Sequence, residues 1–202
     1  MGLFRKDPDI LLKEATSKKK DRDFDNAIKL LKLAYNEISK GPMIYPVDTF
    51  LRLPLYLQAA KRNDEAWREF NLLLTKGYPN QMSDLKLIPM DQSIIYDKMR
   101  LFLQREGKPK LAVRFGIFSF LSWAIGLLRQ KRKDELEEYT SRETIEETVT
   151  KLLKKAKKEN LTGQVITIVE EQISRLPNID FAELGERIHK IIITLDNPQN
   201  SC

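Results

Sequence analysis

Apolar residues recur every three or four positions along most of this chain, and that spacing predicts helices rather than strands. Residues 8–20 and 24–38 each show one such stripe, and Asp7 followed by Pro8 is a typical helix start. The same rhythm recurs in four more segments, so we expect further helices over residues 48–61, 64–76, 92–105 and 109–130. The pattern therefore predicts an all-α protein.

Pro54 interrupts the third of these segments. Its nitrogen carries no hydrogen and cannot donate to the carbonyl of Phe50, so two interpretations stay open. Either the helix begins near residue 51, or it starts from a cap at Asp48 and kinks at the proline. The helix that follows is expected to have Asn63 as its cap.

The last third of the chain contains mixed signals. Thr140 and Glu143 have the spacing of a capping box and predict a helix start ahead of an apolar stripe. The β-branched runs within residues 164–169 and 190–195 would suit strands, although neighbouring carboxylates and a cap spacing at Asp180 favour helix. We expect helices there, over residues 164–175 and 181–195.

The second helix pair shows a set of spaced positions that points to a repeat. Its six positions are, in order, Phe50, Leu53, Pro54, Leu57, Ala66 and Phe70. This order resembles the tetratricopeptide pattern, W-x2-L-G-x2-Y followed by A-x3-F. The corresponding alanines Ala27, Ala66 and Ala112 are 39 and 46 residues apart, which is wider than the family's repeat of about 34 residues.

The resemblance implies a tetratricopeptide-like α-solenoid, in which antiparallel helix pairs stack over residues 8–130. Residues 140–195 lack the pattern and are expected to form a C-terminal helical subdomain, or to continue the same domain. A generic helical bundle is the alternative, because helix pairs with short turns occur in many α proteins. The resemblance also implies an adaptor, a non-enzymatic protein–protein interaction module that binds a protein segment.

In the family that this segment resembles, the first helix of each pair lines the concave face on which ligands lie. Carried over residue by residue, this implies a binding groove, which we call the predicted groove. Its members are Leu12, Thr16, Lys19, Lys20, Leu51, Leu55, Gln58, Asp97, Leu101, Gln104 and Arg105. The alternative is that the C-terminal helices bury these leucines and leave no groove open.

Cysteine and histidine are too scarce for most metal-binding and catalytic chemistry. The chain has one cysteine, Cys202, and one histidine, His189, so neither an internal disulfide nor a cluster of such ligands can form. Its eight glycines are scattered and make no phosphate-binding loop. We therefore expect no catalytic residues, no metal, no cofactor and no small-molecule substrate.

The net charge of +6 is distributed unevenly. Residues 108–133 carry seven basic residues and no acidic one, whereas residues 134–150 carry seven acidic residues and one basic residue. Neighbours of this kind pair in the fold or form solvated helix faces. Basic runs at 18–20, 129–133 and 151–158 leave a second hypothesis, a nucleic-acid-binding regulator, although no aromatic residues are interleaved with them for stacking on bases.

Residues 115–128 form the longest apolar run, and basic residues flank it on both sides. The run is shorter than the span of about 20 residues that a membrane helix needs, and is more typical of a buried core helix. A membrane-surface protein that uses residues 111–133 is the third hypothesis. Residues 1–9 contain no long apolar stretch, and we expect a cytoplasmic protein.

Overall fold

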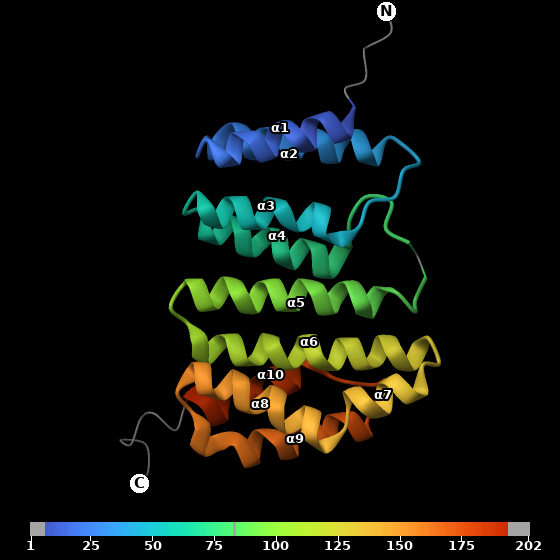
Figure 1. Cartoon of the computed structure of the whole chain (residues 1–202), viewed down its shortest axis with the longest axis vertical. Helices are drawn as coiled ribbons and strands as arrows, with labels where there is room; N and C mark the ends of the chain where they lie inside the picture. Colours follow the sequence, from blue (N-terminus) through green and yellow to red (C-terminus); the bar gives the residue numbers. More distant parts are fainter. Residues whose placement is uncertain (1–6, 83, 194–202) are drawn as a thin grey trace, which may run out of the picture. The chain divides into compact units, whose positions relative to one another are not determined.

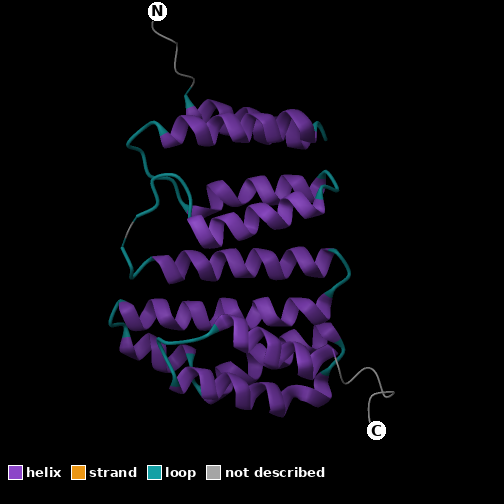
Figure 2. Ribbon diagram, turned by 180° about the vertical axis from the view of Figure 1, so that it is seen from behind, coloured by secondary structure: helices purple, strands orange, loops and turns teal. Residues whose placement is uncertain are grey.

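All regular structure in the described part of the chain is helical. The computed structural model describes residues 7–82 and 84–193, which contain ten α helices, one 3-10 helix and no strand (Figure 2). The all-α prediction is therefore confirmed. The chain forms two compact units, residues 1–83 and 84–202. Their boundary lies inside the range 8–130 that the sequence assigns to the repeat region.

The first unit consists of two helix pairs (Figure 1). Its helices are α1 (Pro8–Lys20), α2 (Phe24–Ser39), α3 (Val47–Ala59) and α4 (Asn63–Lys76). Helix α1 packs on α2, α3 packs on α4, and α2 also packs on α3. Ala15, Ala27 and Ala34 have no exposed surface, which shows how closely the helices of the first pair approach.

Pro54 lies inside α3, and the helix continues through it. The proline cannot donate to the carbonyl of Phe50, so that oxygen needs another donor. The hydroxyl of Tyr35, on α2, lies 2.7 Å from the carbonyl oxygen of Thr49 and 3.3 Å from that of Phe50, and donates there. Burial raises the pKa of the Tyr35 phenol, so the group keeps the proton that it donates.

The second unit is assembled around one long helix, α6 (Figure 1). Its elements are α5 (Ile88–Arg105), α6 (Pro109–Arg129), α7 (Lys133–Tyr139), α8 (Arg142–Ala156), the 3-10 helix η1 (Glu159–Leu161), α9 (Thr162–Ser174) and α10 (Phe181–Ile193). Helix α6 packs against α5, α7, α8, α9 and α10. Its length and hydropathy would allow it to cross a membrane, but 72% of its most apolar stretch of 18 residues is buried inside the protein. The core helix of a soluble protein can have the same length and hydropathy.

Aromatic rings connect α6 to its neighbours. Phe118 on α6 lies 5.4 Å from Tyr96 of α5 and 5.1 Å from Phe181 of α10, measured between ring centroids. Phe120 stacks on Tyr139 of α7 at 4.7 Å. Contacts of this size and geometry add to the stabilisation from buried apolar area. They hold three different helices against the apolar surface of α6.

A glycine on α6 lies against a side chain of α8. A Cβ atom added at Gly116 would lie 2.6 Å from a methyl group of Leu152, which is closer than such atoms come in proteins. The absence of a side chain at Gly116 therefore leaves room for the side chain of Leu152.

Several predicted helix starts are corrected by the structure. Helix α3 starts at Val47 with Pro46 as its N-cap, and Asp48 lies in its first turn. Asn63 is the first residue of α4 rather than its cap, and Arg62 takes the cap position. Helix α5 begins at residue 88, four residues before the expected start. The physical reason is that a cap depends on backbone angles and not only on residue type.

The capping box at Thr140 and Glu143 is also wrong. Ser141 is the N-cap of α8, and its hydroxyl accepts a hydrogen bond from the backbone N–H of Thr144 at 3.3 Å. Thr140 instead donates to the carbonyl of Leu136 at the end of α7, a short helix that the apolar pattern does not predict.

The β-branched segments near the C-terminus are helices, as expected. Helix α9 spans Thr162–Ser174 and α10 spans Phe181–Ile193. The Asp180 carboxylate caps α10 and accepts from the backbone N–H groups of Ala182 at 2.9 Å and Glu183 at 3.0 Å. Residues 194 and 195 lie outside the described residues.

We expect the Tyr35 hydroxyl to matter because of Pro54. Tyr35→Phe should lower the free energy of unfolding of the first unit by about 1–2 kcal/mol, since a polar backbone group loses its donor. In a Pro54→Ala background the new backbone N–H of residue 54 can donate to the carbonyl of Phe50. There, Tyr35→Phe should lower the free energy of unfolding by at least about 1 kcal/mol less than in the natural sequence. Urea unfolding followed by Trp67 fluorescence, with Trp123 replaced by Phe, measures both. Equal costs in the two backgrounds would contradict this explanation.

Candidate functional site

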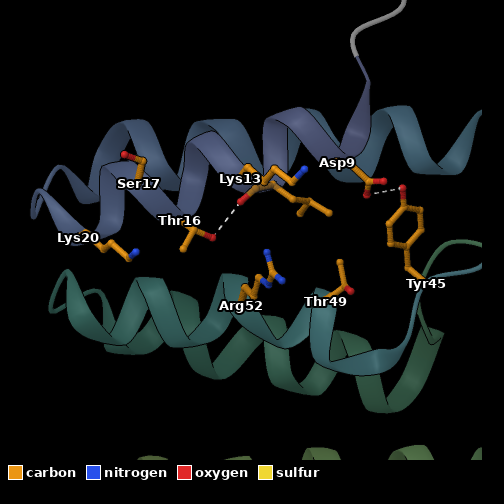
Figure 3. Close-up of a pocket in the computed structure, with 9 residues that line it drawn as sticks. Asp9, Lys13, Thr16, Ser17, Lys20, Tyr45, Thr49 and Arg52 are labelled. Atoms are coloured by element: carbon orange, nitrogen blue, oxygen red, sulfur yellow. Dashed lines mark hydrogen bonds between the residues drawn. The ribbon is translucent and has the colours of Figure 1, made fainter.

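A pocket of about 510 Å³ opens in the first unit between α1 and α3 (Figure 3). We call it the α1–α3 pocket. Helix α1 contributes residues at spacings of three and four along one face, α3 contributes Thr49 and Arg52, and the α2–α3 connection contributes Tyr45. The residues from α1 are Asp9, Leu12, Lys13, Thr16, Ser17 and Lys20. A volume of this size is within the range of ligand-binding pockets.

Three residues of the predicted groove line this pocket: Leu12, Thr16 and Lys20. The Thr16 hydroxyl donates to the carbonyl of Leu12 at 2.9 Å, which leaves its oxygen able to accept from a ligand. Lys19 does not line the pocket. Its ammonium group lies 5.7 Å from the ring centroid of Tyr56, so it bridges the end of α1 and helix α3.

The pocket has an excess of positive charge. Lys13, Lys20 and Arg52 are basic, and Asp9 is its acidic member. Figure 3 shows Arg52 rising from α3 toward α1, while Lys20 lies along the lower side of α1. Cations gathered around one pocket attract anions and select against other cations.

The single carboxylate at this site is already engaged. The Tyr45 hydroxyl donates to Asp9 at 3.0 Å, which ties the α2–α3 connection to the start of α1 (Figure 3). Burial, and then this hydrogen bond, raise the pKa of the Tyr45 phenol. Tyr45 therefore stays neutral and donates to Asp9 at all ordinary pH values. Among the basic residues of the pocket, Lys13 is one helical turn from this carboxylate, and Lys20 is at the far end of α1 from it.

The second helix pair contributes different residues from those expected. Leu51 is 1% exposed and Gln58 is 7% exposed, so both belong to the interior, and Leu55 is half-buried outside the pocket. Arg52, the neighbour of Leu51, lines the pocket instead. One residue turns a helix by about 100°, so a one-position error in phase replaces a ligand-facing residue by a core residue.

The remaining members of the predicted groove are on α5, in the second unit. The Asp97 carboxylate accepts from Arg100 at 2.8 and 2.6 Å, and the Gln104 side-chain oxygen accepts from Arg100 at 3.2 Å. Leu101 is half-buried and Arg105 is exposed. These four residues line no part of the α1–α3 pocket.

Six pocket residues were missed by sequence reasoning: Asp9, Lys13, Ser17, Tyr45, Thr49 and Arg52. Lys13 follows Leu12 directly and could have been found by extending the face of α1 by one position. Arg52 is three residues after Thr49, so a helical projection that starts at Val47 would have paired them. Tyr45 lies outside any helix, and no periodic pattern identifies it.

The chemistry of the pocket is that of donors and positive charge. Ammonium, guanidinium and hydroxyl groups bind carboxylates through charge-assisted hydrogen bonds. Among the described residues, no group of three or more His, Cys, Asp or Glu side chains is placed to hold a metal ion. The arrangement therefore suits binding of an anionic group.

Comparison with known proteins found no match. The chain matches none of the family models, curated proteins or solved structures with which it was compared. The tetratricopeptide resemblance thus rests on the residues quoted above and stays a prediction.

Adjacent positions on α3 should respond differently to the same substitution. Leu51→Asp places a charge in the interior and should lower the free energy of unfolding by about 4 kcal/mol or more. Arg52→Asp changes a pocket residue and should cost about 1 kcal/mol or less. Thermal unfolding followed by circular dichroism tests both. A folded, stable Leu51→Asp protein would show that Leu51 is not a core residue.

Proposed function

We propose that this protein is a non-enzymatic protein–protein interaction module, an adaptor, that binds an acidic segment of a partner protein in the α1–α3 pocket. We further propose that its helix pairs are a tetratricopeptide-like repeat surface and that it works in the cytoplasm. The observation that supports the proposal most is the position of the pocket. It lies between the first helices of two consecutive pairs, and three basic side chains line it.

The composition of the pocket indicates which segment would fit. Leu12 and Tyr45 are buried and form the apolar wall of the pocket, whereas Lys13, Lys20 and Arg52 provide charge. An extended peptide with an aliphatic side chain beside two or more carboxylates satisfies both. Exposed ion pairs contribute little individually, so several must act together and the apolar anchor must contribute as well.

The two other functions considered from the sequence receive less support. Helix α6, the core of the segment 111–133, is mostly buried in the second unit, which favours a structural role over contact with a membrane. The basic run 18–20 lies in the last turn of α1, where positive charge stabilises the negative end of a helix dipole. The helix dipole therefore accounts for the position of these three lysines without any role in binding nucleic acid.

A displayed library of random peptides tests the proposal, because it offers the pocket many different short segments at once. We expect the selected peptides to be enriched in Asp and Glu next to an aliphatic residue. A synthetic peptide from this set should lose at least about tenfold in affinity for the variant Lys20→Glu with Arg52→Glu, measured by fluorescence anisotropy.

The matched control is Lys29→Glu with Lys76→Glu, which makes the same change in net charge in the same unit. Lys76 is in the last turn of α4, as Lys20 is in the last turn of α1, and neither control residue lines the pocket. The control should change affinity by less than about threefold. Equal losses in both variants, or no enrichment of acidic peptides, would refute the proposal.

A further inference from the structure

A second basic pocket, of about 620 Å³, lies within the second unit. It forms where the turn between α5 and α6 meets the ends of α8 and α10, and we call it the lysine pocket. Five of its lining residues are lysines, namely Lys108, Lys110, Lys155, Lys157 and Lys158. None of the described residues that line it is acidic. The two groups of lysines are more than 40 positions apart in the sequence, and the fold brings them to one pocket.

Helix dipoles explain only part of this concentration of charge. Lys155 lies in the last turn of α8 and Lys157 is its C-cap, where cations stabilise the negative end of a helix. Lys108 and Lys110 have the opposite placement. They are at the start of α6, whose first turn contains no acidic residue. Cations at that end are repelled by the helix dipole and by the other lysines.

The start of α6 is a second feature of this pocket that favours an anion. The side chain of the N-cap residue, Lys108, makes no capping hydrogen bond, and the helix is 21 residues long. The first backbone N–H groups of a helix have no partner within it and point outward from its end. An anion in the lysine pocket would therefore be stabilised by the lysines and by the end of α6 together.

The remaining lining residues limit the type of anion. Pro109, Leu111, Ala156 and Ile193 give the pocket an apolar part, and none of the described lining residues is aromatic. Without an aromatic ring, the pocket cannot stack unpaired bases as single-strand binders do. Its size suits a compact ligand rather than a long polymer.

From these observations we infer that the lysine pocket binds a compact ligand with several phosphate groups. Lysine is a point charge that binds phosphate well, and a pocket lined by five lysines attracts a polyanion more strongly than it attracts a single carboxylate or phosphate. Such a ligand is either a soluble polyphosphorylated molecule or the headgroup of a phosphorylated lipid. This site is separate from the α1–α3 pocket, and its function does not depend on peptide binding there.

Inositol hexakisphosphate is the soluble probe, titrated into the full chain by calorimetry at about 150 mM salt. We expect saturable binding with one site. Lys108→Glu with Lys155→Glu should weaken it by at least about tenfold, because two cations become anions within the pocket. Both side chains are exposed, so the fold should be kept, and circular dichroism checks this.

The matched control is Lys133→Glu with Lys154→Glu. Lys154 shares the last turn of α8 with Lys155, and Lys133 begins α7 much as Lys108 precedes α6. Neither lines the pocket, and the net charge changes equally. The control should weaken binding by less than about threefold.

Vesicles distinguish the two sources of the ligand. Sedimentation with phosphatidylcholine vesicles that contain phosphatidylinositol bisphosphate, abolished by the pocket variant alone, would support the lipid headgroup. Binding of inositol hexakisphosphate without vesicle binding would support a soluble ligand. The inference is overturned if inositol hexakisphosphate does not bind or if both variants weaken it equally. Tighter binding of a single-stranded oligonucleotide, equally affected by both variants, would also overturn it.

Discussion

Helix α6 has apolar side chains around its whole circumference, and the second unit is arranged to keep them away from water. A helix of this kind cannot remain exposed in a soluble protein, so neighbours must cover it on every side. Helices α5, α7, α8, α9 and α10 provide that cover. Gly116 leaves room for the side chain of Leu152 on α8, and the ring of Tyr139 closes the side toward α7. The arrangement of five helices thus follows from the composition of one.

The two basic pockets lie at the margins of these packed interiors. In each, an apolar wall from the core adjoins lysine or arginine side chains whose charged ends reach solvent. The charge of the lysine pocket comes from the end of α8 and from the start of α6 with the turn before it, whereas in the α1–α3 pocket Lys20 is at a helix end and Lys13 and Arg52 lie on exposed or half-buried positions within their helices. The interior therefore determines the positions of the backbone, while basic side chains outside the interior give each pocket its preference for anions.

Local pattern was sufficient for most helices but not for the sites. Apolar spacing predicted α1 and α2 well, and Asp180 was identified as a cap from its spacing to Glu183, because a cap involves residues only a few positions apart. Helix α7 was missed because it has seven residues and none of them is buried. Pro54 could not be interpreted, because its compensation by the hydroxyl of Tyr35 comes from another helix. The lysine pocket combines segments that are far apart in the sequence, and no local pattern shows that.

Hydrogen–deuterium exchange measured by mass spectrometry tests the central role of α6 most directly. If this helix is the covered core of the second unit, the amides of residues 109–129 should exchange more slowly than those of α7 and α10 in buffer without lipid. Anionic vesicles should leave that protection unchanged. Rapid exchange of α6 in buffer, with protection that appears only when vesicles are added, would show that the helix is a membrane-binding segment and would contradict the account.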